Sequence, residues 1–232
     1  MSLNHSPAIV TDGLVLCLDA ANIRSYPKTG TAWSDLAGAN DGTLTNMDFA
    51  NNFNTDNSGN FTFDGASDFI DLGANIVDPF PITMCVWFRT TTTPSASNMI
   101  FAQANSTNTN NYQIFQFYTD AKLYWQIRGG STISAQSISS TTLNDGVWHH
   151  AVGVSASSSN HKLYIDGVLD GSSTTSVGAT SPDTLRIGCW KRNNGSESNF
   201  YNGDVGLAQM YNRALSADEV RQNYEATVGR YT

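Results

Sequence analysis

The segment Lys162–Asp170 reads KLYIDGVLD, with two short runs of strand-forming residues on either side of an Asp-Gly pair. Asp166 and Gly167 tolerate the positive φ angles of a type I′ turn, which is among the commonest two-residue connections of a β-hairpin. The segment therefore predicts two adjacent antiparallel strands joined by a tight turn.

Similar runs, rich in Val, Ile, Phe, Tyr, Trp and Thr, recur from Leu14 to about Tyr211 between clusters of Gly, Asn, Asp and Ser. The run Ile82–Arg89, ITMCVWFR, is apolar with few interruptions, which is typical of a central strand covered on both faces. The runs Tyr112–Tyr118 and Lys122–Ile127 are separated by three residues, a length that favours a second hairpin. This rhythm predicts an all-β fold.

One stretch, Ser216–Ala226, has a helical pattern instead. Ser216 can accept from the backbone amide of Glu219, and the Glu219 side chain can reach back, which is a capping box. Many short strands and one terminal helix predict a two-sheet antiparallel sandwich with a short C-terminal helix. A chain of 232 residues fits one such domain. We expect it to occupy residues 13–232, after an N-terminal extension over residues 1–12.

The charge balance argues against a nucleic-acid partner. The chain has 12 Lys and Arg against 20 Asp and Glu, a formal net charge of −8, whereas binding to a phosphate backbone needs basic side chains. The longest apolar runs, such as Leu14–Leu18 and Met84–Phe88, hold about five residues, far fewer than the roughly 20 of a membrane-spanning helix. We therefore expect neither nucleic acid nor a membrane span.

The N-terminal segment and the cysteines indicate the compartment. Met1–Pro7 lacks the basic start and the apolar core of a secretory signal. Cys17, Cys85 and Cys189 each lie inside an apolar run and cannot all pair with one another within one chain. We interpret them as buried, reduced thiols, and we expect assembly in a cytoplasm.

Five segments in a fixed order carry a resemblance to a known family. They are Gly13–Ala20 (GLVLCLDA) with Ser25–Pro27 and Trp33–Gly38, then Phe61–Ile70 (FTFDGASDFI), Asp145–Val152 (DGVWHHAV), Leu163–Val168 (LYIDGV), and Gly203–Ser216 with Glu219 and Val220. Together they resemble the laminin-G-like branch of the concanavalin A-like jelly-roll superfamily over almost the whole chain. The resemblance implies a jelly-roll sandwich. It implies a task only loosely, because related sandwiches serve as lectins, glycosidases, adhesion modules and virion parts.

Catalysis is not indicated. The chain has three Glu residues, Glu197 in a polar loop and Glu219 and Glu225 on the helix, so no strand carries the Glu-x-Asp-x-x-Glu-like row of the glucanases in this superfamily. Asp64 and Asp68 are the nearest pair that could substitute, but Asp64 before Gly65 is typical of a turn cap. His149 and His150 point to opposite faces of a strand and cannot easily grip one ion.

No cofactor is expected, with one exception that stays open. Several members of this superfamily bind a calcium ion, and Ca²⁺ accepts carboxylate and carbonyl oxygens from irregular loops. Four aspartates are conceivable ligands: Asp19, Asp64, Asp68 and Asp204. Because no contiguous Asp-x-Asp-x-Asp loop is present, capping of turns without a metal is the alternative interpretation.

A carbohydrate site is the remaining candidate. Sugar rings stack on exposed aromatic rings, while Asn side chains bond their hydroxyls. Four residues at loop ends could form such a patch: Trp190, Asn193, Tyr201 and Tyr112. The alternative is that Trp190 packs in the core, as we expect for Trp33, Trp87, Trp125 and Trp148.

We therefore predict a non-catalytic binding or structural module. The resemblance, the missing export signal and the unpaired thiols favour a structural protein of a phage virion, such as a capsid decoration or fibre component, which contacts other virion proteins and self-associates. A lectin-like adhesion module, on a fibre or on a bacterial surface, is the alternative. A glycosidase is the third possibility.

Overall fold

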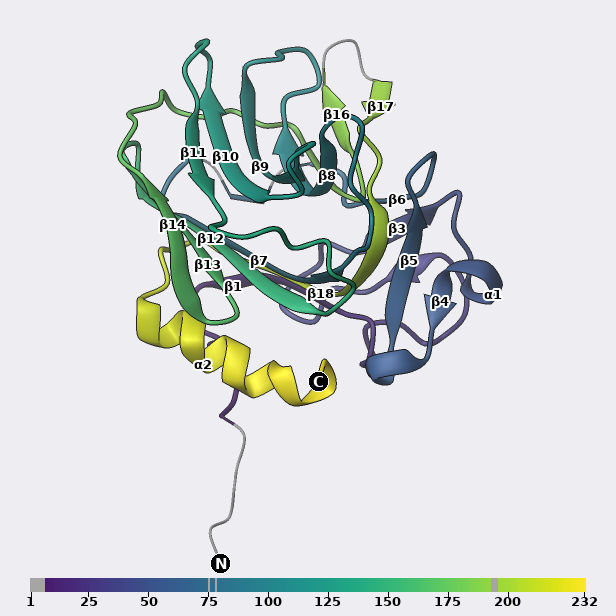
Figure 1. Cartoon of the computed structure of the whole chain (residues 1–232). Helices are drawn as coiled ribbons and strands as arrows, with labels where there is room; N and C mark the ends of the chain where they lie inside the picture. Colours follow the sequence, from purple (N-terminus) through teal and green to yellow (C-terminus); the bar gives the residue numbers. More distant parts are fainter. Residues whose placement is uncertain (1–6, 75, 78, 193–195) are drawn as a thin grey trace, which may run out of the picture.

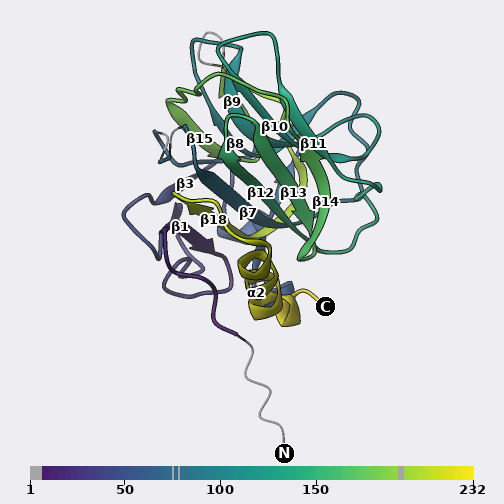
Figure 2. The ribbon, with the colours of Figure 1, turned by 90° about the vertical axis from the view of Figure 1, so that its left-hand side faces the viewer.

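The computed structural model describes residues 7–74, 76–77, 79–192 and 196–232, and over these residues the chain forms two eight-stranded antiparallel sheets. The sheets lie face to face, and helix α2 (Ala217–Thr227) lies against the outer face of one of them (Figure 1). Turned by 90°, the molecule shows three layers, with the β8–β11 sheet above, the β7–β12 sheet in the middle and α2 below (Figure 2). The predicted all-β sandwich with a short C-terminal helix is confirmed.

The first sheet, called sheet A, runs in the order β14 (Val168–Ser173), β13 (Asn160–Ile165), β12 (His149–Ser157), β7 (Ile82–Arg89), β18 (Asn202–Tyr211), β5 (Asn60–Asp64) and β4 (Phe53–Asn54), with β1 (Leu14–Asp19) also paired to β18. The second, sheet B, runs in the order β11 (Ala135–Ile138), β10 (Leu123–Gly129), β9 (Asn111–Phe117), β8 (Asn98–Ala104), β15 (Thr184–Ile187), β6 (Phe69–Asp71), β3 (Gly42–Thr45) and β2 (Ala32–Trp33). A separate hairpin joins β16 (Trp190–Arg192) to β17 (Ser196–Ser198).

The predicted central strand and both predicted hairpins are present. Strand β7 is buried along almost its whole length, between β12 and β18. Strands β9 and β10 pair antiparallel, as do β13 and β14. At the second turn Asp166 has φ 50° and Gly167 has φ 79°, which are the left-handed values that a type I′ turn requires.

The core lies between the sheets and is dominated by large aromatic and aliphatic side chains. Trp33 and Trp125 are fully buried there, and Trp87 and Trp148 are buried on the outer face of sheet A, under α2 and the C-terminal residues. Trp87 donates from Nε1 to Thr227 Oγ1 at 2.8 Å, which ties β7 to α2. The expectation that these four tryptophans pack inside is confirmed. The three cysteines are buried and unpaired, as expected.

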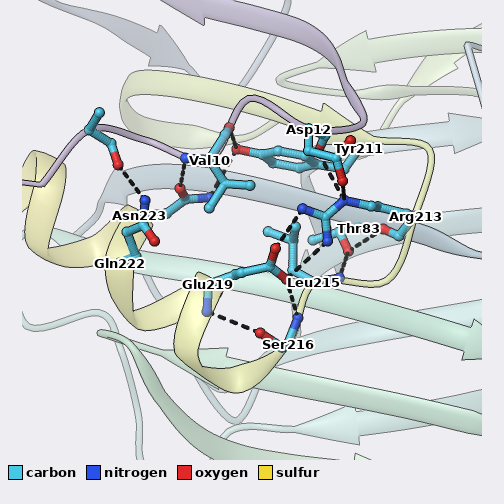
Figure 3. Close-up of polar contacts among 11 residues, drawn as sticks. Val10, Asp12, Thr83, Tyr211, Arg213, Leu215, Ser216, Glu219, Gln222 and Asn223 are labelled. Atoms are coloured by element: carbon cyan, nitrogen blue, oxygen red, sulfur yellow. Dashed lines mark hydrogen bonds and ion pairs between the residues drawn. The ribbon is translucent and has the colours of Figure 1, made fainter.

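Helix α2 begins as the sequence predicts. The Ser216 hydroxyl accepts from the Glu219 amide at 3.3 Å, and Glu219 Oε2 accepts from the Ser216 amide at 2.8 Å (Figure 3). The predicted capping box is therefore formed. No helix in the described part of the chain has the length and apolar content that crossing a membrane requires.

The residues just before Gly13 are packed against α2 and the end of β18. Val10 is 8% exposed, and its backbone amide donates to Asn223 Oδ1 on α2 at 2.8 Å (Figure 3). The Tyr211 hydroxyl donates to the Val10 carbonyl at 3.0 Å. Arg213 then holds the following turn, with Nε 2.9 Å from the Asp12 carbonyl oxygen. Part of the predicted extension therefore contacts the sandwich directly, and residues 1–6 lie outside the described residues.

Two local features differ from the prediction. A four-residue helix, α1 (Phe49–Asn52), is capped by Asp48, whose Oδ1 accepts from the Asn51 amide at 2.8 Å. Glu197, expected in a loop, lies on β17, and its carboxylate is 3.6 Å from the Lys191 ammonium across the hairpin.

Candidate functional site

A polar hollow of about 570 Å³ lies at the end of the sandwich where the chain crosses from β7 of sheet A to β8 of sheet B. We call it the rim hollow. It is lined by the crossing loop, by the segment before β18 and by one turn glycine: Thr92, Thr93, Pro94, Ser95, Ala96, Ser97, Asn98, Asn199, Phe200, Asn202 and Gly65. A volume of this size is typical of small-molecule sites.

Hydrogen bonds from the β18 side hold the crossing loop in place. Thr90 Oγ1 donates to the Asn202 carbonyl oxygen at 2.7 Å, and Thr92 Oγ1 donates to Asn202 Oδ1 at 3.2 Å. Asn199 Nδ2 donates to the Ser97 carbonyl oxygen at 2.6 Å. The wall of the hollow is therefore held by hydrogen bonds at both of its ends.

Trp190 supports this wall from inside. Its Nε1 donates to Asn199 Oδ1 at 3.0 Å and lies 2.9 Å from Ser198 Oγ. Its ring meets Tyr112 edge-on, with the centroids 5.6 Å apart. Both amide ends of Asn199 are thus occupied by the protein, and Asn199 positions the loop rather than presenting free polar atoms to a ligand.

Phe200 and Asn98 are the groups that the hollow can offer to a ligand. Phe200 is half-buried and lines the hollow. Among the described residues, the side chain of Asn98 has no hydrogen-bond partner, and the same holds for Ser95. An apolar ring beside uncommitted amide and hydroxyl groups suits a ligand with an apolar face and hydroxyl edges, which is the chemistry of a sugar.

A smaller groove of about 330 Å³ adjoins the hollow and shares Asn202 with it. Its charged pair is Arg89 and Asp204, with Arg89 Nε 2.8 Å from Asp204 Oδ2. Asp204 Oδ1 also accepts from the Thr62 hydroxyl. The guanidinium carbon of Arg89 lies 5.1 Å from the ring centroid of Trp148, a cation–π distance. The charges of Arg89 and Asp204 therefore neutralise each other within the groove.

The predicted carbohydrate residues do not form an exposed patch, and that prediction is wrong for three of them. Tyr112, Trp190 and Tyr201 are 4%, 4% and 1% exposed, so no sugar ring can stack on them. Asn193 lies outside the described residues and stays a prediction. The alternative interpretation, that Trp190 is packed, agrees with the structure. Phe200, which the sequence analysis did not single out, lines the hollow one residue before Tyr201.

The four predicted calcium ligands do not converge. The two carboxylate oxygens of Asp19 lie 2.8 and 2.9 Å from Arg230 Nη1, and those of Asp204 are occupied by Arg89 and Thr62. In the part of the chain that the structure describes, no group of three or more His, Cys, Asp or Glu side chains is arranged to hold a metal ion. The aspartates therefore do not fit a calcium site built from all four.

Asp64 and Asp68 do lie together, in a turn beside the hollow. Asp64 Oδ1 accepts from the amides of Ala66 and Ser67 at 2.8 and 2.9 Å and from the Asp68 amide at 3.1 Å. Slight burial raises the pKa of Asp64, but these amide hydrogen bonds outweigh it and leave the pKa lowered. Burial, together with the charge of Asp64, raises the pKa of Asp68. The turn-capping interpretation accounts for both carboxylates.

The adjacent histidines point apart, as predicted. His149 Nδ1 lies 2.8 Å from Asp166 Oδ2, whereas the His150 ring stacks on Trp87 with centroids 5.1 Å apart. Burial raises the pKa of the Cys17 thiol to about 11 and raises those of Cys85 and Cys189 further, so none is an activated thiolate.

The family model described as concanavalin A-like lectin/glucanases superfamily matches residues 64–221, which is more than half of the chain. The chain belongs to this superfamily. The match agrees with the resemblance of the sequence segments and with the two-sheet sandwich. No curated protein sequence matches the chain.

Solved structures give the same fold. The Trypanosoma rangeli sialidase in complex with the inhibitor DANA matches 99% of this chain with a TM-score of 0.68 and 16% identity. The NanB sialidase (K499G mutant) of Streptococcus pneumoniae matches 70% of this chain, with a TM-score of 0.58 and 20% sequence identity. The match to the CBM40 of a Ruminococcus gnavus IT-sialidase covers 64% of this chain and 94% of the CBM40 chain. Its TM-score is 0.52, at 14% sequence identity.

This concanavalin A-like chain spans only part of the larger proteins: 36% of the T. rangeli sialidase chain and 27% of the NanB chain. At such low identity the likeness establishes the lectin-like fold alone.

Proposed function

We propose that the chain is a non-catalytic carbohydrate-binding module that holds its glycan in the rim hollow. One observation carries the proposal: a half-buried aromatic ring, Phe200, lines a hollow of about 570 Å³ whose other lining residues are mostly Thr, Ser and Asn, with Pro94, Ala96 and Gly65. Phe200 supplies a stacking surface for the apolar face of a sugar ring, and Asn98 supplies hydrogen bonds to its hydroxyls.

The absence of catalysis is part of the proposal. A glycosidase needs two carboxyl groups that face one another across the bond to be cleaved. Asp68 beside the hollow is 3% exposed, and its Oδ2 accepts from Asn52 Nδ2 at 2.8 Å and from the Asp64 amide at 3.1 Å. Asp64 caps three amides. Both carboxylates are committed to hydrogen bonds within the turn, which supports a binding role rather than a hydrolytic one.

Binding to a glycan array by the purified chain tests the proposal. We expect signals that Phe200→Ala lowers by about tenfold or more, as for a central aromatic contact. Phe49→Ala is the matched control, because Phe49 is a 39% exposed phenylalanine on α1. We expect Asn98→Ala to lower binding about fivefold, the loss of a hydrogen bond or two. Release of reducing ends from a polysaccharide, abolished by Asp64→Asn, would contradict the non-catalytic assignment.

For its biological setting we propose a phage virion, as a capsid decoration or fibre component that contacts other virion proteins and copies of itself. The support is chemical: three buried, unpaired thiols suit assembly in a reducing cytoplasm. Proteomic analysis of purified virions from the source should detect the chain. Recovery only from a bacterial surface fraction would favour the adhesion module instead.

A further inference from the structure

We infer that the rim hollow selects uncharged glycans and that the carboxylate of Asp64 disfavours acidic ones. The inference rests on the proposed function, because it names the class of ligand for the same site. It separates this chain from a sialic-acid binder, although several proteins of the same fold are sialidases.

The lining of the hollow contains no ionisable side chain among the described residues. The carboxylate of a sialic or uronic acid would therefore meet no cation there, and burying an unpaired charge is costly. The guanidinium of Arg89 in the adjoining groove already pairs with Asp204 at 2.8 Å and stacks over Trp148. Releasing Arg89 for a ligand would leave Asp204 without its cation.

The charged residue that adjoins the lining along the chain is negative. Asp64 immediately precedes Gly65 of the lining, and Asn202 Nδ2 donates to the Asp64 carbonyl oxygen at 3.1 Å, which holds this turn against the wall. The three amides that donate to the carboxylate keep it ionised, since hydrogen bonds to the charged form favour that form. The chain as a whole carries −8, so the wider field has the same sign.

A neutral oligosaccharide and its acidic counterpart should therefore differ in affinity. Two like charges a few ångströms apart in a solvated groove change an equilibrium by about fivefold to tenfold, and salt screens the effect. Exclusion of this kind gives specificity through a repulsive element rather than through an added contact.

An array that carries matched neutral, sialylated and uronate-containing oligosaccharides tests the inference, at about 20 mM and 500 mM NaCl. We expect neutral glycans to bind at least about fivefold tighter than their acidic forms at low salt, with a smaller ratio at high salt. Equal or preferential binding of the acidic forms would overturn the inference and leave the proposed function standing. If no glycan binds at all, the proposed function fails, and the inference fails with it.

The role of Asp64 has its own test. Asp64→Asn keeps an oxygen that can cap the turn but removes the charge, so we expect the neutral-to-acidic affinity ratio to fall toward one. Asp218→Asn is the control, because it removes one charge from an 88% exposed side chain on α2. Thermal unfolding of each variant confirms that it is folded. A ratio unchanged in folded Asp64→Asn, or changed equally in Asp218→Asn, would exclude Asp64 as the selective group.

Discussion

Gly153 of β12 lies directly under the indole of Trp125 from the opposite sheet: a Cβ at position 153 would stand 2.3 Å from Trp125 Cδ2. Trp125 is fully buried, and its Nε1 donates to Ser155 Oγ at 3.1 Å, so the ring cannot move aside without losing that bond. The two sheets can meet at this point only because residue 153 has no side chain.

We therefore expect Gly153→Ala to destabilise the domain by about 2–3 kcal/mol, the range of an overpacked core. Gly229→Ala is the control, since a Cβ there meets nothing within 4 Å. Urea unfolding followed by tryptophan fluorescence measures both. Equal stability of the two variants would show that the sheets can separate to admit a methyl group.

The strap over residues 8–12 depends on one amide side chain. Asn223 accepts from the Val10 amide at 2.8 Å and donates to the Tyr211 hydroxyl at 2.9 Å, all within a buried cluster. Asn223→Ala removes one hydrogen-bond partner from the Val10 amide and one from the Tyr211 hydroxyl. We expect it to lower the free energy of unfolding by about 1–3 kcal/mol. Gln222→Ala, which loses one exposed bond to the Ala8 carbonyl, should cost about 0.5 kcal/mol or less.

Amide hydrogen exchange locates this effect. In Asn223→Ala the amides of residues 8–12 should exchange faster than in the unaltered chain, and in Gln222→Ala they should not. Unchanged protection in both variants would mean that Val10 is held by its apolar contacts alone.

The two adjacent histidines should make stability depend on pH in opposite directions. Burial lowers the pKa of His150 to about 4, so the unfolded chain takes up a proton that the folded chain refuses as the pH falls below about 6.5. His150 therefore costs stability on acidification, up to about 3 kcal/mol near pH 4. In His150→Phe this acid-dependent loss should shrink, as urea unfolding between pH 7 and pH 4.5 will show.

The pKa of His149 is shifted in the opposite direction, so its effect on stability has the opposite dependence on pH. Burial disfavours its charged form, but the hydrogen bond to Asp166 and the charges of Asp166 and Asp145 outweigh this and raise its pKa. Its stabilising contribution is full below about pH 6.5 and is lost as the pH rises through the folded-state value. Titration by NMR should show Asp166→Asn lowering the pKa of His149 more than Asp145→Asn does, because Asp145 is the more distant partner at 3.3 Å. The opposite ranking would be inconsistent with this geometry.

Calcium should have no effect on stability. The carboxylates of Asp19 and Asp204 are paired with Arg230 and Arg89, and binding of Ca²⁺ to either would first have to break an ion pair. We expect the same Tm in 1 mM EDTA and in 5 mM CaCl₂. A calcium-dependent rise of several degrees would mean that ligands other than these ion-paired groups hold the ion.

The fold is largely encoded in local signals, which is why the sequence predicts it. The Asp166-Gly167 turn and the Ser216–Glu219 capping box each depend on residues a few positions apart, whose conformational preferences act regardless of the rest of the chain. The apolar run Ile82–Arg89 likewise favours a single position, a central strand whose two faces are both covered by other parts of the protein. Segments of this kind also carry the family resemblance.

The rim hollow has no such local signal. Its wall is built by contacts such as Thr90 Oγ1 to the Asn202 carbonyl, between residues 112 positions apart, and no short pattern encodes that pairing. Phe200 and Tyr201 show the difficulty on the smallest scale. They are neighbours in one polar stretch, yet Phe200 lines the hollow while Tyr201 is buried and donates its hydroxyl to the Arg89 carbonyl at 2.9 Å. The alternation of neighbouring side chains along an extended chain was the available signal, but the register is set only by the pairing of β18.

The most direct test of the central claim is to map a bound glycan on the isotope-labelled chain by NMR, with the neutral oligosaccharide that gives the strongest array signal. We predict that the amide shifts which move on titration cluster at residues 92–98, at 199–202 and at Gly65. Shifts confined to another surface, such as the outer face of sheet B, would contradict the assignment of the rim hollow as the glycan site.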